Sequence, residues 1–220
     1  MNTLIRNIVK YTYQPLLVKY LSATRQYRYG KLILEVPPEV FHPGFFTSTG
    51  YLLHHVMQMD LKNMTLLVLG AGSGIVGIAS AKQGAIVTAI DINPVAVQCI
   101  TANMRRNQVS IQIFESDLFD ALPSGSFDVI AVNPPYYSKD PLSMKEHAWY
   151  CGSNGQYFRK LFQQVPEYMH ENTQVLMTLC DGADLEMIRQ HALEGGCMLN
   201  CIHQKQHFLQ KNFLYSITLC

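Results

Sequence analysis

Two features of the chain suit the binding of a nucleoside cofactor: a glycine-rich loop and an acid that follows it. The loop is Gly70-Ala71-Gly72-Ser73-Gly74, and Asp91 comes about 20 residues further on. Glycines let the backbone turn tightly and approach a ligand closely, and a helix that starts after them points N–H groups toward it. A carboxylate at the end of the next strand can accept hydrogen bonds from both ribose hydroxyls. These two features alone fit NAD and other adenosine cofactors equally.

Two later segments indicate what the cofactor and its reaction partner would contact. Asp117 follows a predicted strand, where its carboxylate can accept a hydrogen bond from an adenine amino group. The backbone N–H of Leu118 can donate to the adenine ring, and the Leu118 side chain can pack against that ring. The segment Asn133-Pro134-Pro135-Tyr136 follows the next predicted strand. Because ligands of open α/β sheets bind at the carboxyl ends of the strands, we expect the chemistry to take place at this segment.

The elements that must position these segments alternate along the chain. Short apolar runs predict strands over 65–69, 86–90, 111–115, 127–132 and 174–179. Helices are expected over 49–60, 75–83, 94–107, 155–170 (with a kink or break at Pro166) and 184–193. Two last strands, 198–203 and 213–219, have no obvious helix between them and predict an antiparallel hairpin. The pattern therefore predicts an α/β fold, a doubly wound, mostly parallel seven-stranded sheet with an antiparallel edge hairpin.

The N-terminal part of the chain differs from the rest in charge. The net charge of the 220 residues is +1, but residues 1–34 contain six basic residues, five tyrosines and no acid. We expect a helix over 3–22 and a strand over 31–36, and we divide the chain into a basic helical extension, 1–45, and a mildly acidic domain, 46–220. Cations interleaved with aromatic rings can hold phosphates and stack bases, so RNA docking by residues 1–31 is one hypothesis. A solvated helical face whose tyrosines pack on the domain is the other.

The composition excludes several classes of protein. With 48% hydrophobic and only 15% charged residues, the chain does not resemble a long disordered one. No apolar run approaches the roughly 20 residues of a membrane span, so we expect no membrane contact. The cysteines include no CxxC pair, and the group Cys197, Cys201, His203 and His207 lacks the spacing of a standard zinc site. We therefore expect no metal and a reducing, cytoplasmic location.

The segments 70–74, Asp91, Asp117 and 133–136 stand in the order found in the class I S-adenosylmethionine-dependent methyltransferases. The chain resembles the members that carry an N-P-P-Y motif, the HemK-like group, over about residues 40–220. The resemblance implies S-adenosylmethionine as the cofactor. It also implies a set of cofactor-binding residues: Gly70, Ala71, Gly72, Gly74, Asp91, Ile92, Asp117, Leu118 and Asn133. One position departs from the family, because Val68 replaces the usual acid that helps to hold the methionine end of the cofactor.

The resemblance further implies methyl transfer to a planar NH2 group. The lone pair of such a nitrogen is delocalised, and hydrogen-bond acceptors aimed at its two N–H bonds position it and favour the developing positive charge. The side-chain oxygen of Asn133 and the backbone carbonyl of Pro134 can supply those acceptors, and Tyr136 offers a flat face to the substrate. We therefore expect Asn133, Pro134 and Tyr136 to be catalytic. The residues expected to bind substrate are Pro135, Tyr136, Tyr137, Phe46 and Thr49.

The acceptor that the resemblance favours is a protein glutamine, and adenine N6 or guanine N2 of a nucleic acid is the alternative. Residues 39–53 resemble the segment that covers the cofactor pocket in HemK-like enzymes, and residues 148–158 partly match another stretch of that group. The extension is shorter than the substrate-recruiting domain of the bacterial release-factor enzymes. We keep three hypotheses for the partners of the chain: a translation factor as substrate, RNA held by the extension, and a small activating partner. An NAD-dependent oxidoreductase and an inactive binding protein are remoter alternatives.

Overall fold

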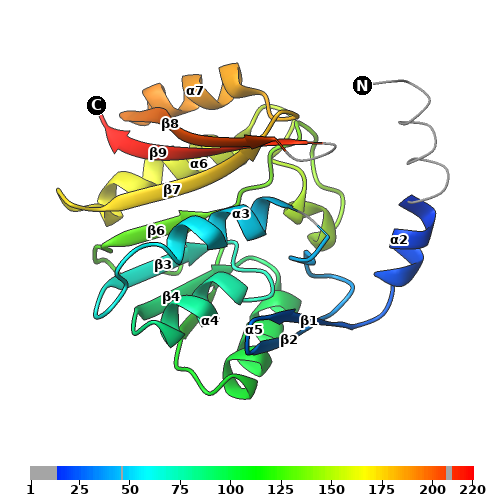
Figure 1. Cartoon of the computed structure of the whole chain (residues 1–220). Helices are drawn as coiled ribbons and strands as arrows, with labels where there is room; N and C mark the ends of the chain where they lie inside the picture. The colour runs from blue at the N-terminus through cyan, green and yellow to red at the C-terminus, as the bar shows by residue number, and fades with distance from the viewer. Residues whose placement is uncertain (1–13, 46, 207–209) are drawn as a thin grey trace.

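The computed structural model describes residues 14–45, 47–206 and 210–220 (Figure 1). The first part of the helix predicted over 3–22 lies outside the described residues, and so do Phe46 and His207. Within the described residues no helix combines the length and the apolar character that crossing a membrane would need. All six cysteines are free.

The centre of the protein is the predicted seven-stranded sheet, and the structure confirms that prediction. From edge to edge its strands are β5 (Gln112–Glu115), β4 (Ile86–Asp91), β3 (Thr65–Leu69), β6 (Val129–Val132), β7 (Gln174–Cys180), β9 (Lys211–Leu219) and β8 (Cys197–Gln206). The first five strands are parallel, and β9 is antiparallel to both of its neighbours. The last two strands thus form the predicted hairpin at one edge.

Helices cover both faces of this sheet (Figure 1). One face packs against α3 (Thr47–Val56), α4 (Ile75–Lys82) and α5 (Pro94–Arg106), and the other against α6 (Gln156–Gln164) and α7 (Leu185–Glu194). Neighbouring residues of a central strand belong to different cores: Ile130 packs toward α6, whereas Ala131 packs toward α3 and α4. Because both faces are buried, the central strands are continuously apolar rather than alternating.

A two-stranded hairpin precedes the main sheet, after the short helix α2 (Gln14–Tyr20). It consists of β1 (Arg25–Tyr29) and β2 (Leu32–Val36), paired antiparallel. The sequence predicted a strand only over 31–36, because β1 reads Arg-Gln-Tyr-Arg-Tyr and has no apolar alternation. The carboxamide of Asn103 on α5 binds both backbone groups of Glu35, and that of Asn107, the residue that follows α5, binds both backbone groups of Ile33. These bonds hold the hairpin on α5.

A closed loop lies at the carboxyl ends of the parallel strands. Its two ends are joined by backbone bonds, since Tyr137 N–H donates to Trp149 (3.1 Å) and Cys151 N–H donates to Tyr137 (3.0 Å). Between them runs the short 3-10 helix η2 (Met144–Ala148). The helix predicted over 155–170 is divided into α6 and the 3-10 helix η3 (Val165–Tyr168), as expected from Pro166.

The strand order reverses between β3 and β6, which lie side by side while β4 and β7 continue outward in opposite directions. In doubly wound sheets the crevice at this reversal, beyond the carboxyl ends of the strands, is where ligands bind. The glycine loop leaves β3 at this point and Asn133 leaves β6. The topology therefore brings the two segments together although more than 50 residues of sequence separate them.

Candidate active site

The glycine loop turns sharply between β3 and α4. Gly72 has a φ of +55° and Gly74 a φ of +81°, both in the left-handed region that favours glycine. At Gly74 a Cβ atom would also lie only 3.2 Å from a side-chain carbon of Ile100. The Ala71 N–H donates to the Ile90 carbonyl at 2.9 Å, which fixes the loop against the end of β4.

Asp91 ends β4 with a buried carboxylate that faces this loop. One oxygen accepts a hydrogen bond from the Gly72 N–H at 2.8 Å, and the other accepts one from the Asn93 N–H at 2.9 Å. Burial raises the pKa of the Asp91 carboxyl, and the two N–H donors partly offset that effect. Each carboxylate oxygen keeps lone-pair capacity for a further donor, such as a ribose hydroxyl.

Asp117 and Leu118 follow β5 on the same edge of the sheet. The Nζ atom of Lys160, on α6, lies 2.6 Å from Oδ2 of Asp117 and 2.6 Å from Oδ2 of Asp120. Lys160 thus fixes the carboxylate of Asp117 through Oδ2, and Oδ1 can accept a hydrogen bond from a ligand. Leu118 has a φ of +53° and a buried side chain.

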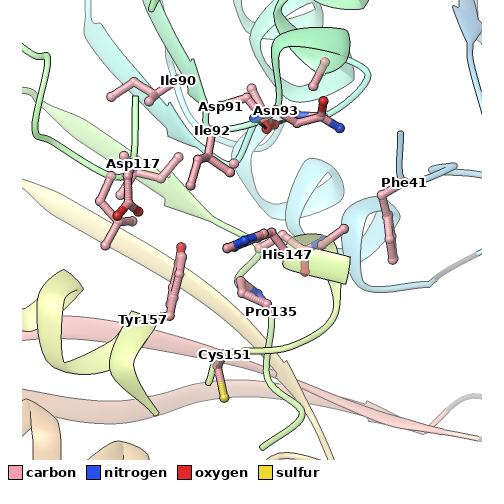
Figure 2. Close-up of a pocket in the computed structure, with 18 of the residues that line it drawn as sticks. Phe41, Ile90, Asp91, Ile92, Asn93, Asp117, Pro135, His147, Cys151 and Tyr157 are labelled. Atoms are coloured by element: carbon pink, nitrogen blue, oxygen red, sulfur yellow. Dashed lines mark hydrogen bonds between the residues drawn. The ribbon is translucent and has the colours of Figure 1, made fainter. Parts of the chain in front are cut away.

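These residues line one cavity of about 370 Å³, in the size range of small-molecule sites. Figure 2 shows Asp91 and Asp117 on one side of it and Pro135 and His147 on another. The Tyr157 side chain points up toward Asp117 (Figure 2). Burial first, and then the carboxylates of Asp117 and Asp91, raise the pKa of the Tyr157 phenol, so that it remains a neutral hydroxyl.

Asn133 stands at the end of β6 with its carboxamide held from two sides. Its Nδ2 donates to the hydroxyl oxygen of Thr49, on α3, at 3.1 Å. Its Oδ1 accepts a hydrogen bond from the hydroxyl of Thr178, on β7, at 3.0 Å. Asn133 lines the 370 Å³ cavity, and so do Ile92 and Thr49.

Asn133 also lines a second and much smaller cavity, of about 10 Å³. Pro134 and Tyr136 line this small cavity, whereas Pro135 lines the large one. Its other walls include the rings of Phe41 and Trp149, whose centroids are 5.0 Å apart at an angle of 55°. Successive residues of the Asn-Pro-Pro-Tyr segment thus face two different spaces, with Asn133 common to both.

Residues 31–148 match the family described as Methyltransferase small domain, which is more than half of the chain. The chain belongs to this family. A putative protein N5-glutamine methyltransferase of Methanocaldococcus jannaschii is 36% identical over 157 residues, a match that covers 68% of this chain and 77% of that protein. A release factor glutamine methyltransferase of Geobacter sulfurreducens is 26% identical over 192 residues, or 82% of this chain and 66% of that enzyme.

Solved structures of methyltransferases share the fold at lower identity. The Mtq2–Trm112 complex of E. cuniculi, which methylates the translation termination factor eRF1, contains a chain with a TM-score of 0.62 and 14% identity, and the match covers 83% of this chain and 99% of that one. The 16S rRNA N2 G1207 methyltransferase of T. thermophilus, solved with AdoMet and guanosine, has a TM-score of 0.59 and 18% identity over 88% of this chain and 50% of that one. The family and this fold establish the protein as an S-adenosylmethionine-dependent methyltransferase, as predicted.

The large cavity of this methyltransferase fits the cofactor that the family uses. A buried carboxylate suits the ribose hydroxyls, the carboxylate of Asp117 suits the adenine amino group, and the apolar side chains of Ile92 and Leu118 suit the adenine ring. Val68 also lines the cavity, so the position of the usual acid faces the ligand with an apolar side chain instead. The methionine end therefore has to find its polar contacts elsewhere among the lining residues.

Other predicted site residues lie around these two cavities. Gly70, Ala71 and Gly72 line the large cavity. Gly74 does not line it and is the residue before α4. Tyr136 is buried, and its hydroxyl accepts a hydrogen bond from Gln210 at 3.3 Å. Tyr137 lines neither cavity and is 38% exposed.

Sequence patterns did not single out Tyr157, Lys160 or Thr178 as members of the site. Both Tyr157 and Lys160 lie in the first turns of α6: Tyr157 is within the stretch 148–158 that partly matches HemK-like enzymes, and Lys160 follows that stretch by two residues. This position was the available signal. Thr178 carries a fully buried hydroxyl in β7, where the residues after Gln174 are otherwise apolar. A polar residue in such a strand needs a hydrogen-bond partner, which points to a nearby polar site without identifying it.

Proposed function

We propose that this methyltransferase transfers a methyl group to the side-chain amide nitrogen of a protein glutamine. The observation that carries the proposal is that Asn133, at the end of β6, lines both the large and the small cavity. We assign the large cavity to the methyl donor and the small cavity to the substrate group that accepts the methyl. In this assignment the carboxamide of Asn133 lies next to both the methyl donor and the nitrogen that accepts the methyl group.

The chemistry at this point needs hydrogen-bond acceptors more than it needs a base. When bound, S-adenosylmethionine supplies an electrophilic methyl group on a positively charged sulfur. Asn133 Oδ1 and the Pro134 carbonyl accept hydrogen bonds from the two N–H bonds of the substrate and hold the nitrogen in line with that methyl group. As the C–N bond forms and the C–S bond breaks, positive charge develops on the nitrogen, and the same two oxygens stabilise it. The nitrogen then releases one proton to water.

The size of the small cavity supports a carboxamide over a nucleobase. About 10 Å³ corresponds to roughly one water-sized probe, so the walls must move for either group, and less for the three heavy atoms of a carboxamide than for a fused purine ring. Relatives named as glutamine methyltransferases support the same acceptor.

The test uses the purified chain, methyl-labelled S-adenosylmethionine and fractionated cell extract. We expect label that resists nuclease, is removed by protease, and maps by mass spectrometry to a glutamine side chain. Asn133→Ala should lower the rate by about 100-fold or more, the scale for losing one transition-state partner, with little change in cofactor affinity. Nuclease-sensitive label would favour the nucleobase alternative, and equal rates in Asn133→Ala and wild type would remove Asn133 from the mechanism.

We also propose that the substrate is a cytoplasmic protein of the translation apparatus, held partly by the basic extension. Within the described residues, Arg28 and Lys31 lie on the β1–β2 hairpin and form no ion pair with a carboxylate. Replacing both with serine should raise KM for the substrate and reduce its dependence on salt, with kcat unchanged. An unchanged KM would exclude this role for the hairpin.

A small activating partner is a separate proposal. It is tested by adding extract fractions to the purified chain and measuring whether the rate of methyl transfer increases.

A further inference from the structure

Thr178 is joined to Asn133 by the register of the central strands. Val132 of β6 pairs with Met177 of β7, so the next residues along, Asn133 and Thr178, are also neighbours. Thr178 is fully buried, and its hydroxyl lies 3.0 Å from Asn133 Oδ1. On the opposite side, the hydroxyl oxygen of Thr49 lies 3.1 Å from Asn133 Nδ2. The carboxamide therefore has one threonine hydroxyl at each end, from two elements that are far apart in sequence.

The orientation of this carboxamide decides what it can do. The two ends of a carboxamide are similar in shape, and the torsion that exchanges them has a broad, roughly two-fold preference. The substrate nitrogen that receives the methyl group carries two hydrogens, so it needs the oxygen of Asn133 as a hydrogen-bond acceptor. If the carboxamide were rotated, its NH2 group would face the NH2 group of the substrate, and two donors would oppose each other. Because Oδ1 has two lone pairs, it can accept from Thr178 and still accept from a substrate.

We propose that Thr178 is a positioning residue that, with Thr49, holds the Asn133 carboxamide in the orientation needed for methyl transfer. The proposal rests on the function proposed above. Thr178 lines neither cavity, so its effect on the reaction has to pass through Asn133. Thr49 comes from α3, whose first turn is also tied to the sheet by the bond from Asn212 Nδ2 to Thr47 Oγ1 at 2.7 Å. The start of α3 and the strand β7 thus set one catalytic torsion between them.

The alternative is that Thr178 only satisfies its own buried hydroxyl. In that case Thr178→Val, which keeps the shape and removes the hydroxyl, would alter stability alone. If Thr178 positions Asn133, the same change leaves Oδ1 without its fixed donor and lets the carboxamide rotate. The rate of transfer then falls, while the cofactor site, which is built from other residues, keeps its affinity.

The experiment compares Thr178→Val and Thr178→Ser with the matched control Thr88→Val. Thr88 is another buried threonine of the parallel sheet, and it lines neither cavity. For Thr178→Val we expect a fall of about tenfold in kcat, the effect of one lost hydrogen bond, with the dissociation constant of S-adenosylmethionine unchanged by calorimetry. Thr178→Ser should restore most of kcat, and Thr88→Val should keep the wild-type value.

A second readout does not depend on activity. The side-chain NH2 resonances of Asn133, identified by their loss in Asn133→Asp, should shift or broaden in the ligand-free Thr178→Val protein and return in Thr178→Ser. Wild-type kcat in Thr178→Val together with unchanged resonances would overturn the proposal. If the wild-type chain transferred no methyl group to protein, the proposed function would fail, while the resonances would still decide whether Thr178 holds Asn133.

Discussion

The backbone N–H of Gly72 donates to the carboxylate of Asp91 at 2.8 Å, so the end of β4 holds the glycine loop directly. Three of the five loop residues are glycines without side chains that could fix the shape of the loop, and Gly70, Gly72 and Gly74 all adopt left-handed conformations. The acid that is expected to bind the ribose therefore has a second task in the ligand-free protein, which is to satisfy buried N–H groups of the loop and of Asn93.

Asp91→Ala should impair both tasks. Loss of the carboxylate should weaken S-adenosylmethionine binding by about 1–3 kcal/mol, and two buried N–H groups without acceptors should lower the free energy of unfolding by about as much. Asp91→Asn retains one acceptor oxygen and should lose less of each. Calorimetry with cofactor and denaturant unfolding measure the two effects separately. An unchanged dissociation constant in Asp91→Ala would count against the ribose assignment.

The buried position of Asp91 also predicts that the stability of the fold depends on pH. In the folded chain burial raises the pKa of this carboxyl, whereas in the unfolded chain it stays near the ordinary value of about 3.9. Between these two values the folded state binds the proton more tightly, so the contribution of Asp91 to the free energy of unfolding should decrease as the pH rises.

Cofactor affinity should change with pH in the opposite sense, because ribose hydroxyls donate to the charged carboxylate. As the pH falls through the raised pKa of Asp91, the dissociation constant of S-adenosylmethionine should increase. Asp91→Asn, which does not titrate, should lose this part of the dependence. Parallel pH profiles in wild type and Asp91→Asn would show that Asp91 does not titrate in contact with the ligand.

The ion pair between Lys160 and Asp117 predicts a graded pair of effects on cofactor binding. Asp117→Ala removes the expected acceptor of the adenine amino group and should weaken binding by about 1–2 kcal/mol. Lys160→Met keeps the acceptor and removes only its partner. Since both side chains are partly exposed, the loss should be below about 1 kcal/mol. A larger effect of Lys160→Met than of Asp117→Ala on the dissociation constant would place Lys160, and not Asp117, against the ligand.

The sequence predicted the sheet, its edge hairpin and the order of the site segments because those features are local. Apolar runs identify the strands, glycines identify the loop, and an acid after a strand identifies its carboxyl end. The partners of Asn133 could not be predicted in this way. Thr49 and Thr178 reach it through the docking of α3 and the register of β7, which depend on contacts between residues 84 and 45 positions apart.

For the same reason the chemistry of the Asn-Pro-Pro-Tyr segment could be predicted from its residue types, whereas its geometry could not. The residue types indicate hydrogen-bond acceptors on a stiff backbone. Which of them faces which space depends on the loop 137–151 and on Trp149, which closes the small cavity against Phe41. That loop has no strong periodicity, so its path follows from tertiary contacts.

Asn103 is fully buried on α5 and connects the N-terminal hairpin to the candidate cofactor site. Its side chain exchanges hydrogen bonds with both backbone groups of Glu35, at 2.8 and 2.9 Å, and donates a further bond to the Ser73 carbonyl in the glycine loop at 3.1 Å. Asn103→Leu keeps the branched shape of the side chain but leaves these backbone groups without partners. The free energy of unfolding should fall by about 2–3 kcal/mol or more.

Asn107 offers the matched control, because its carboxamide binds both backbone groups of Ile33 on the same strand but no residue of the glycine loop. Asn107→Leu should destabilise the hairpin by a similar amount. Only Asn103→Leu should also weaken S-adenosylmethionine binding, since only that change releases the Ser73 carbonyl and with it the shape of the loop. Equal dissociation constants in the two variants, measured by calorimetry below the unfolding transition, would show that the hairpin and the cofactor loop are not coupled through Asn103.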